Sequence, residues 1–207
     1  MTSVTQKMAI RGRFLDIQNT VSQAAQIPEH TRYIEDGLLI SENGKITWFG
    51  SWLEGQTQLT DNIQVNHYPE QLIVPGFIDT HIHFPQTEMV GAYGEQLLEW
   101  LNTYTFPTEM QFADKSYADK IAQFFVNELL RNGTTTALVF CTVHPQSVDA
   151  LFEAAEQLQM RLIAGKVMMD RHAPEALTDT AQSAYDDSKA LIEKWHGKGR
   201  NLYAVTQ

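Results

Sequence analysis

Two histidines and one carboxylate recur at every second position near the end of an apolar segment. They are Asp79, His81 and His83. Side chains of an extended strand alternate between two faces, so these three would point the same way. Neutral imidazole is a good zinc ligand, and two imidazoles spaced in this way can reach one ion without bending the backbone. We therefore predict that His81 and His83 bind a metal ion and that Asp79 orients one of them from behind.

The position of the pair carries more weight than the pair itself. A bare His-x-His is weak evidence, because histidine is also common as an ordinary polar residue. Here Pro75-Gly76 precedes an apolar strand, the histidines end it, and Pro85 interrupts the backbone pairing just beyond. The pair is therefore expected at the carboxyl end of a strand, where parallel α/β folds place their active sites.

The residues after Gln86 alternate between helical and strand patterns. Apolar residues at spacings of three and four predict helices at 97–104, 114–131, 147–160 and 178–195. Apolar and β-branched runs predict strands at 134–140, 161–168 and 201–206. Strands that alternate with helices of this length favour a parallel sheet with right-handed crossovers. The first helix contains Trp100, which its spacing favours as a core residue over a platform for substrate.

The first part of the chain has a different pattern, with four short strands and no candidate chemistry. The strands are expected at residues 9–17, 32–40, 45–49 and 65–73. Asn43-Gly44 lies between two of them, and this pair favours a tight hairpin because both residues tolerate a positive φ.

Charge and cysteine usage exclude several classes of protein. The 207 residues carry 15 basic and 25 acidic side chains, a formal charge of −10, and no basic cluster. Nucleic acids and anionic membranes are therefore not expected as partners. The single Cys141 cannot form an internal disulfide, and it cannot supply the two cysteines of the zinc deaminases that act on flipped bases. No secretory signal or membrane-spanning run is visible, so we expect a cytoplasmic protein.

Six short segments together carry a family resemblance. The segment from Pro75 to His83 resembles the first barrel strand of the amidohydrolase superfamily of metal-dependent hydrolases. The further segments, taken with it, resemble the guanine deaminases within that superfamily, and they are His83–Gln86, Leu97–Leu101, Tyr104–Glu109, Asn132–Thr136 and Gly165–Asp170. Their joint occurrence over most of the chain is far more specific than any one of them.

The resemblance implies an α/β fold built as part of a (β/α)8 TIM-type barrel. Residues 73–207 would form about the first four βα units, since a whole barrel takes about 250 residues. Residues 1–72 would form a β-rich segment that belongs to a small composite β-sandwich.

The activity implied by the resemblance is zinc-dependent hydrolysis of guanine to xanthine and ammonia, a step of purine catabolism. One zinc ion would be held partly by His81 and His83, with iron as the alternative metal. Gln86 matches the glutamine that contacts the substrate, and the resemblance also predicts substrate contacts for the neighbouring Phe84 and Pro85. Full-length members of the family are usually homodimers. Two alternatives stay open: an amidohydrolase acting on another cyclic amidine, such as a pterin, a triazine or a different purine, and a non-catalytic remnant.

Several parts of the family's site have no counterpart in this sequence. A hydrolytic zinc needs three or four protein ligands, and only two are present here. The family's other ligands, two histidines and an aspartate on later strands, are absent, as is the glutamate that moves protons, so no catalytic residue is assigned. The match ends at Val205-Thr206, where Gln207 replaces the family's proline. We expect a truncated form that is inactive alone and poorly soluble or self-associating. Whether His144, Asp170 and Arg171 reach the site is left open.

Overall fold

The computed structural model of the chain describes residues 7–60, 63–94 and 96–206. These residues form two compact units that divide between Pro75 and Gly76. Each unit has its own four-stranded sheet.

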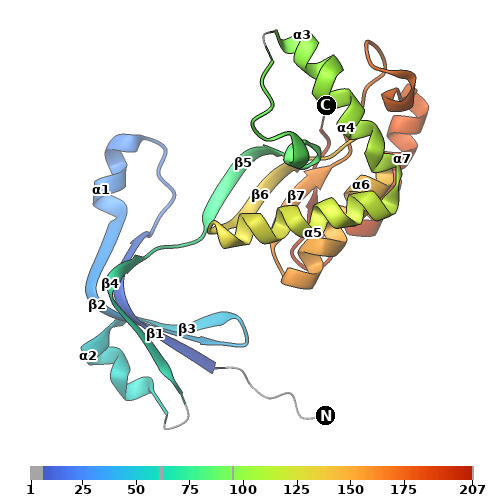
Figure 1. Cartoon of the computed structure of the whole chain (residues 1–207). Helices are drawn as coiled ribbons and strands as arrows, with labels where there is room; N and C mark the ends of the chain where they lie inside the picture. Colours follow the sequence, from blue (N-terminus) through green and yellow to red (C-terminus); the bar gives the residue numbers. More distant parts are fainter. Residues whose placement is uncertain (1–6, 61–62, 95, 207) are drawn as a thin grey trace, which may run out of the picture. The chain divides into compact units, whose positions relative to one another are not determined.

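The first unit is a mixed sheet with strand order β3-β2-β1-β4 (Figure 1). Its strands are β1 (Lys7–Ile17), β2 (Thr31–Glu42), β3 (Lys45–Ser51) and β4 (Val65–Ile73), and its short helices are η1 (Ala24–Gln26), α1 (Ile27–His30), α2 (Trp52–Gly55) and η2 (Gln56–Gln58). β4 runs parallel to β1, and the other pairs are antiparallel. A small core forms where Ala9, Leu38 and Ile40 pack with Trp48 and Trp52.

The predicted hairpin of this unit is confirmed. Asn43 and Gly44 connect β2 to β3, with φ values of 53° and 76°. Positive φ at both central residues matches the right-handed twist of the two strands, and asparagine followed by glycine adopts it with little strain.

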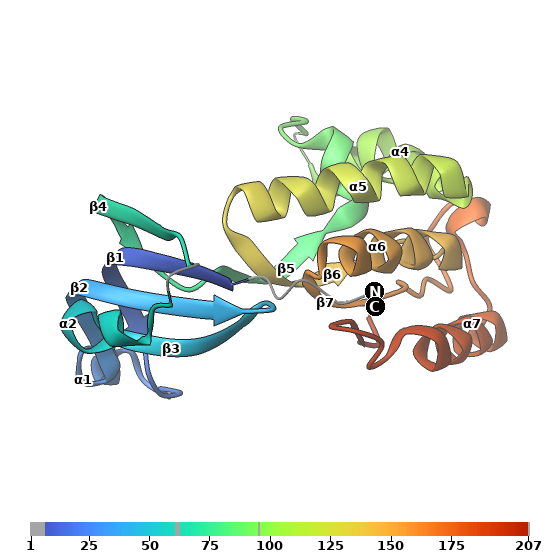
Figure 2. The same ribbon diagram turned by 90° about the horizontal axis from the view of Figure 1, so that it is seen from below.

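The second unit is an α/β fold around a parallel sheet in the order β5-β6-β7-β8, as the alternating pattern predicts. Its strands are β5 (Phe77–His83), β6 (Thr134–Phe140), β7 (Arg161–Gly165) and β8 (Leu202–Tyr203). The main helices are α5 (Lys115–Arg131), α6 (Pro145–Leu158) and α7 (Ala181–Trp195), and the shorter ones are η3 (Phe84–Met89), α3 (Leu97–Trp100), the π-helical η4 (Leu101–Thr105), α4 (Phe106–Met110), η5 (Gln111–Ala113) and η6 (Glu175–Leu177). Figure 2 shows α5, α6 and α7 in chain order along one face of this sheet.

The core of the second unit lies between β6, β7 and the helices that cover them. Val139 and Leu162 on the strands and Leu151 and Phe152 on α6 have no exposed surface. α5 begins where the Asp114 carboxylate accepts the Ser116 backbone N–H at 2.8 Å, which supplies a partner for one of the free amides of a helix start. This packing holds the strands in register and so sets which residues meet at their carboxyl ends.

The predicted helix at 97–104 is confirmed, but it is not a regular α-helix throughout. α3 ends at Trp100, a π-helical turn follows, and α4 begins at Phe106. Pro107 lacks a backbone N–H, so it cannot continue the regular hydrogen-bond series, and a π-turn is one way for a helix to absorb such a break. Leu97 and Leu98 are 70% and 73% exposed, so the apolar stripe does not face a core.

The last two strands are shorter than their apolar runs predict. β7 ends at Gly165 rather than at residue 168, although Val167 N–H still donates to the Thr142 carbonyl. β8 has two residues, Leu202 and Tyr203, and pairs only with β7, which leaves its other side without a strand among the described residues. In the part of the chain that the structure describes, no helix combines the length and apolar character needed to cross a bilayer.

Candidate active site

The two imidazoles at the end of β5 converge. The Nε2 atoms of His81 and His83 lie 3.2 Å apart, and the ring centroids 5.1 Å apart. The ladder between β5 and β6 shifts register between Asp79 and Ile82, yet both rings stay on the same side of the strand. His81 is exposed and His83 is half-buried. An external ligand could therefore reach both nitrogens.

The neighbouring strand supplies a support that the sequence analysis missed. Phe140 ends β6 and pairs in register with His83. Its ring stacks on His83 at 4.9 Å with an interplanar angle of 13°, and it contacts His81 at 4.8 Å. The signal was available, because a strand predicted at 134–140 next to the histidine strand places its last aromatic residue beside the pair.

Electrostatics favours the neutral form of one ring. Burial, and then the charge of His81, lowers the pKa of His83. Neutral imidazole has a free nitrogen lone pair, which is the form that binds a metal ion. His83 is therefore ready to bind a cation at neutral pH.

Asp79 contacts the backbone of the pair rather than a ring. Its Oδ1 accepts the His81 backbone N–H at 3.0 Å. The carboxylate therefore restrains the strand at His81, and its predicted role in orienting a histidine ring stays a prediction.

The three residues after His83 have different surroundings. Gln86 is half-buried in η3 and lines a cavity of about 720 Å³ together with His81 and His83. Phe84 has no exposed surface and packs edge-on against Phe112 at 5.0 Å. Pro85 is also buried. The structure gives Phe84 a packing role, and the predicted substrate contacts of Phe84 and Pro85 stay predictions.

Trp100 lines the same cavity, although its spacing favoured a core position. It is half-buried, and its indole N–H donates to the Ala92 carbonyl at 3.1 Å. Gly94 permits this approach, since a side chain there would meet the Trp100 Cβ at 2.6 Å. The hydrogen bond to Ala92 restrains the indole ring, which lines the same cavity as Gln86.

The donor set fits half of a zinc site. Zinc bound at 2.0–2.1 Å by two tetrahedrally placed nitrogens holds them about 3.3 Å apart, close to the 3.2 Å of His81 and His83. Among the residues that the structure describes, no group of three or more His, Cys, Asp or Glu side chains comes together. The pair can bind a cation but needs further ligands to hold it firmly.

The other residues considered at the strand ends do not join the pair. Cys141 is buried, and burial raises the pKa of its thiol, so it belongs to the core. His144 precedes α6 with a buried Nε2 that has no partner. Asp170 and Arg171 are exposed, bond each other at 2.8 Å and line a second cavity of about 810 Å³. Gln207 lies outside the described residues.

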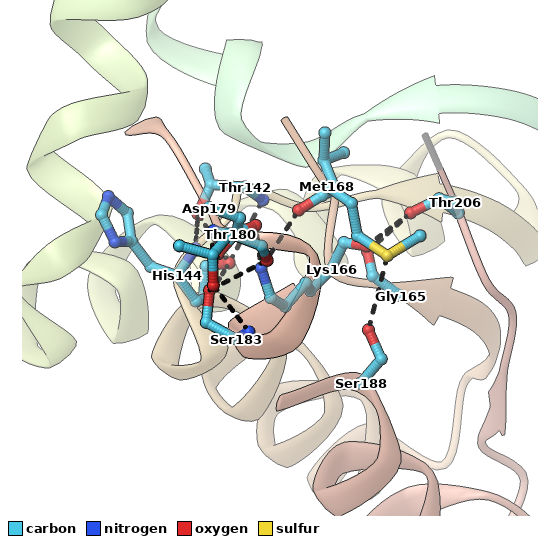
Figure 3. Close-up of polar contacts among 12 residues, drawn as sticks. Thr142, His144, Gly165, Lys166, Met168, Asp179, Thr180, Ser183, Ser188 and Thr206 are labelled. Atoms are coloured by element: carbon cyan, nitrogen blue, oxygen red, sulfur yellow. Dashed lines mark hydrogen bonds and ion pairs between the residues drawn. The ribbon is translucent and has the colours of Figure 1, made fainter. Parts of the chain in front are cut away.

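A buried lysine at the end of β7 was also missed. Lys166 has no exposed surface, and its Nζ lies 2.5 Å from Asp179 Oδ2 (Figure 3). Burial, and then the charge of Lys166, lowers the pKa of nearby His144, whose ring is turned away from the ammonium in Figure 3. A lone lysine inside the apolar run predicted as a strand at 161–168 was the available signal.

The fold and the histidine strand are those of a hydrolase family. Residues 72–205 match the amidohydrolase family. The chain therefore belongs to the amidohydrolase family.

Within this family, the chain is similar to several guanine deaminases. The chain is 62% identical over 198 residues to the guanine deaminase of Escherichia coli, an alignment that covers 96% of this chain and 45% of that protein. A solved structure of E. coli guanine deaminase superposes with a TM-score of 0.92 at 61% identity, over 96% of this chain and 46% of that one. The guanine deaminase of C. acetobutylicum, solved with guanine in its active site, superposes with a TM-score of 0.81 at 27% identity, over 97% of this chain and 46% of that one. The chain thus spans about half the length of these relatives.

Proposed function

We propose that this chain carries the metal-binding strand and part of the substrate pocket of an enzyme that hydrolyses guanine to xanthine and ammonia. The observation that carries the proposal is the meeting of His81, His83 and Gln86 on one cavity at the carboxyl end of a parallel strand. The 62% identity to a guanine deaminase supports guanine as the substrate.

The finer architecture is part of the same proposal. The four parallel strands would be the first half of a (β/α)8 barrel, with the helices outside and the strand ends around the site. The sheet β3-β2-β1-β4 would be one layer of a composite β-sandwich. The high TM-score against a guanine deaminase structure supports both assignments.

The residues of this chain would have distinct tasks in the reaction. His81 and His83 would hold a zinc ion, or iron, with ligands that the described residues do not include. When bound, the metal makes water a nucleophile at neutral pH. Phe140 would keep both rings in position. Overall, water adds to the ring carbon that bears the amine, and the amine leaves as ammonia.

Gln86 and Trp100 would bind the base. A carboxamide has a donor and an acceptor side by side, which suits the edge of a purine. An indole offers a flat surface on which a base can stack, a contact worth about 1–3 kcal/mol in single-stranded nucleic-acid complexes. Together they would hold guanine so that attack by water is effectively intramolecular.

The same assignment suggests the compartment, the pathway and the oligomeric state of the enzyme. We infer a cytoplasmic enzyme of purine catabolism that acts as a homodimer. The acidic charge of −10 and the absence of a basic cluster agree with a small-molecule substrate rather than a nucleic acid. The alternatives are another cyclic amidine as substrate, such as a pterin or a triazine, and a chain without activity.

Xanthine release tests the proposal. The 207-residue chain is assayed with guanine and added zinc, beside the same chain joined to the remaining segment of the E. coli relative. We expect turnover by the joined protein only, and loss of that turnover in His83→Asn but not in His67→Asn, whose side chain is exposed on β4. Turnover by the short chain would contradict the account of the ligands. If the joined protein did not hydrolyse guanine but did act on a pterin or a triazine, the substrate would be another cyclic amidine and not guanine.

A further inference from the structure

The loop between β7 and α7 is closed at its two ends by a buried ion pair. Lys166 is the first residue after β7, and Asp179 lies just before Thr180, which caps α7. Their charged atoms are 2.5 Å apart, with side chains 0% and 11% exposed. Figure 3 shows Lys166 extending from the strand end to the carboxylate.

Backbone hydrogen bonds fix the strand side of this loop. Lys166 N–H donates to the Tyr203 hydroxyl at 3.2 Å, and the Thr206 hydroxyl donates to the Lys166 carbonyl at 2.9 Å. Val167 N–H donates to the Thr142 carbonyl at 3.1 Å. The backbone at Lys166 and Val167 is thus held by Tyr203 on β8 and by residues just beyond the ends of β6 and β8, which makes a firm base for the lysine side chain.

The ion pair matters more at the helix end of the loop than at the strand end. Asp179 N–H donates to the Met169 carbonyl at 2.6 Å, and the Ser183 hydroxyl lies 3.5 Å from Asp179 Oδ1. Between these ends, Met168, Met169 and the Asp170–Arg171 pair form one wall of the 810 Å³ cavity, and α7 forms the other. The position of Asp179 therefore decides where this wall lies.

Stability alone does not explain a charged pair at this point. Removing two charges from water is costly, and well-packed apolar residues often serve stability equally well or better. A charged hydrogen bond is directional, whereas an apolar contact tolerates sliding. The pair therefore specifies a position of the loop more than it adds to the free energy of folding.

We propose that Lys166 and Asp179 form a clasp that fixes the β7–α7 loop and, through it, the cavity wall that carries Met168 to Arg171. Both are positioning residues, since neither lies on the cavity shared by His81, His83 and Gln86. The wall lies at the carboxyl edge of the sheet, so the clasp would also affect guanine binding. Only this last consequence rests on the proposed function.

Trypsin cleavage after Arg171, whose side chain is 73% exposed, reports the position of the loop. The double variant Lys166→Met/Asp179→Leu replaces the pair by apolar residues and leaves no buried charge behind. We expect it to unfold within a few degrees of the wild-type chain but to be cleaved after Arg171 at least tenfold faster. The matched control, Lys115→Met/Asp119→Leu, removes a partly exposed pair on α5 and should leave this cleavage unchanged. A folded double variant with wild-type cleavage would overturn the proposal.

A measurement on the wild-type chain keeps the proposal testable if the double variant does not fold. The Asp179 amide is bound to Met169 within the loop, while the Val167 amide is bound to the sheet. Hydrogen exchange of the two amides should differ by less than tenfold if the clasp holds. Exchange of Asp179 at the rate of a free amide would overturn the proposal.

Guanine binding by the joined protein distinguishes the proposed clasp from the proposed function. We expect the double variant to bind guanine five- to tenfold more weakly, with unchanged zinc affinity at His81 and His83. If the joined protein binds no guanine, the proposed function fails while the cleavage test still decides the clasp. If wild-type and double variant bind guanine equally, the effect on the site is refuted.

Discussion

At the scale of single residues, the site depends on how β5 and β6 place three rings. His81 and His83 share a face of their strand, and Phe140 contacts both from the neighbouring strand. A ring that is already in position loses less conformational entropy when it binds a metal ion. The aromatic contact therefore prepares the pair for binding, although Phe140 itself offers no ligand atom.

Shortening Phe140 should weaken metal binding while leaving both ligands intact. Removal of a residue that orients a metal ligand typically costs about 10- to 100-fold in affinity, and we expect about tenfold for Phe140→Leu, measured by zinc titration of the chain. Phe49→Leu on β3 is the control, because Phe49 belongs to the first unit and its ring contacts Phe14 and Arg32. Equal zinc affinity of the two variants would show that the stacking has no part in binding.

Glu109 on α4 should make the stability of the second unit depend on pH. Burial raises the pKa of this carboxyl from 4.5 to about 7. The folded protein then holds the proton more tightly than the unfolded chain, so stability is fully present below pH 4.5 and falls as the pH rises toward 7. The total effect is about 3 kcal/mol.

The variant Glu109→Gln removes this titration. The free energy of unfolding, measured in urea, should be higher for Glu109→Gln than for the wild-type chain. This difference should grow by about 2 kcal/mol between pH 5 and pH 8. The exposed Glu99→Gln on α3 serves as control and should show no such widening. A constant difference for Glu109→Gln across this range would mean that the carboxyl does not ionise there.

At the scale of elements, capping residues decide where the helices begin. The predicted start of the last helix, residue 178, is wrong by three positions, because Thr180 forms a capping box with Ser183. Its hydroxyl accepts the Ser183 backbone N–H at 3.0 Å, and α7 begins at Ala181. Such a cap supplies a partner for an otherwise free amide of the first turn.

Loss of this cap should have a measurable cost. We expect Thr180→Ala to reduce the free energy of unfolding by about 1 kcal/mol, measured by urea denaturation. Gln182→Ala lies in the same helix, is exposed, and should change stability by less than half of that amount. If both variants were equally stable, the capping box would contribute nothing to α7.

At the scale of the whole molecule, the parallel sheet has two edge strands among the described residues, β5 and β8. Phe77 and Ile78 on β5 are 60% and 68% exposed. An edge with free backbone groups and exposed apolar side chains favours pairing with another chain. The expected self-association of the isolated chain stays a prediction, and this edge is where we place it.

A charge on the β5 edge tests that placement. Ile78→Lys should lower the self-associated fraction of the chain severalfold in sedimentation velocity, because an edge lysine disfavours pairing between chains. Leu53→Lys adds the same charge at a position that is 77% exposed on α2 of the other unit. If Leu53→Lys lowered association equally, net charge rather than the β5 edge would be responsible.

The sequence by itself determined the order of strands and helices and the place where chemistry is concentrated. Local signals were sufficient for these features: Asn43-Gly44 for the hairpin, Asp114 for the start of α5, and alternating residues for the face shared by His81 and His83. Each depends on backbone preferences or on a repeat of two residues, which act within a few positions of the chain.

Only the tertiary structure decided which residues from different elements meet. Phe140 beside the histidines, Trp100 on the cavity with Gln86, and Lys166 buried against Asp179 all depend on strand register and on the packing of loops over strand ends. The same packing buried Phe84 against Phe112. Contacts between distant segments depend on how side chains fill space together, and no local pattern contains that information.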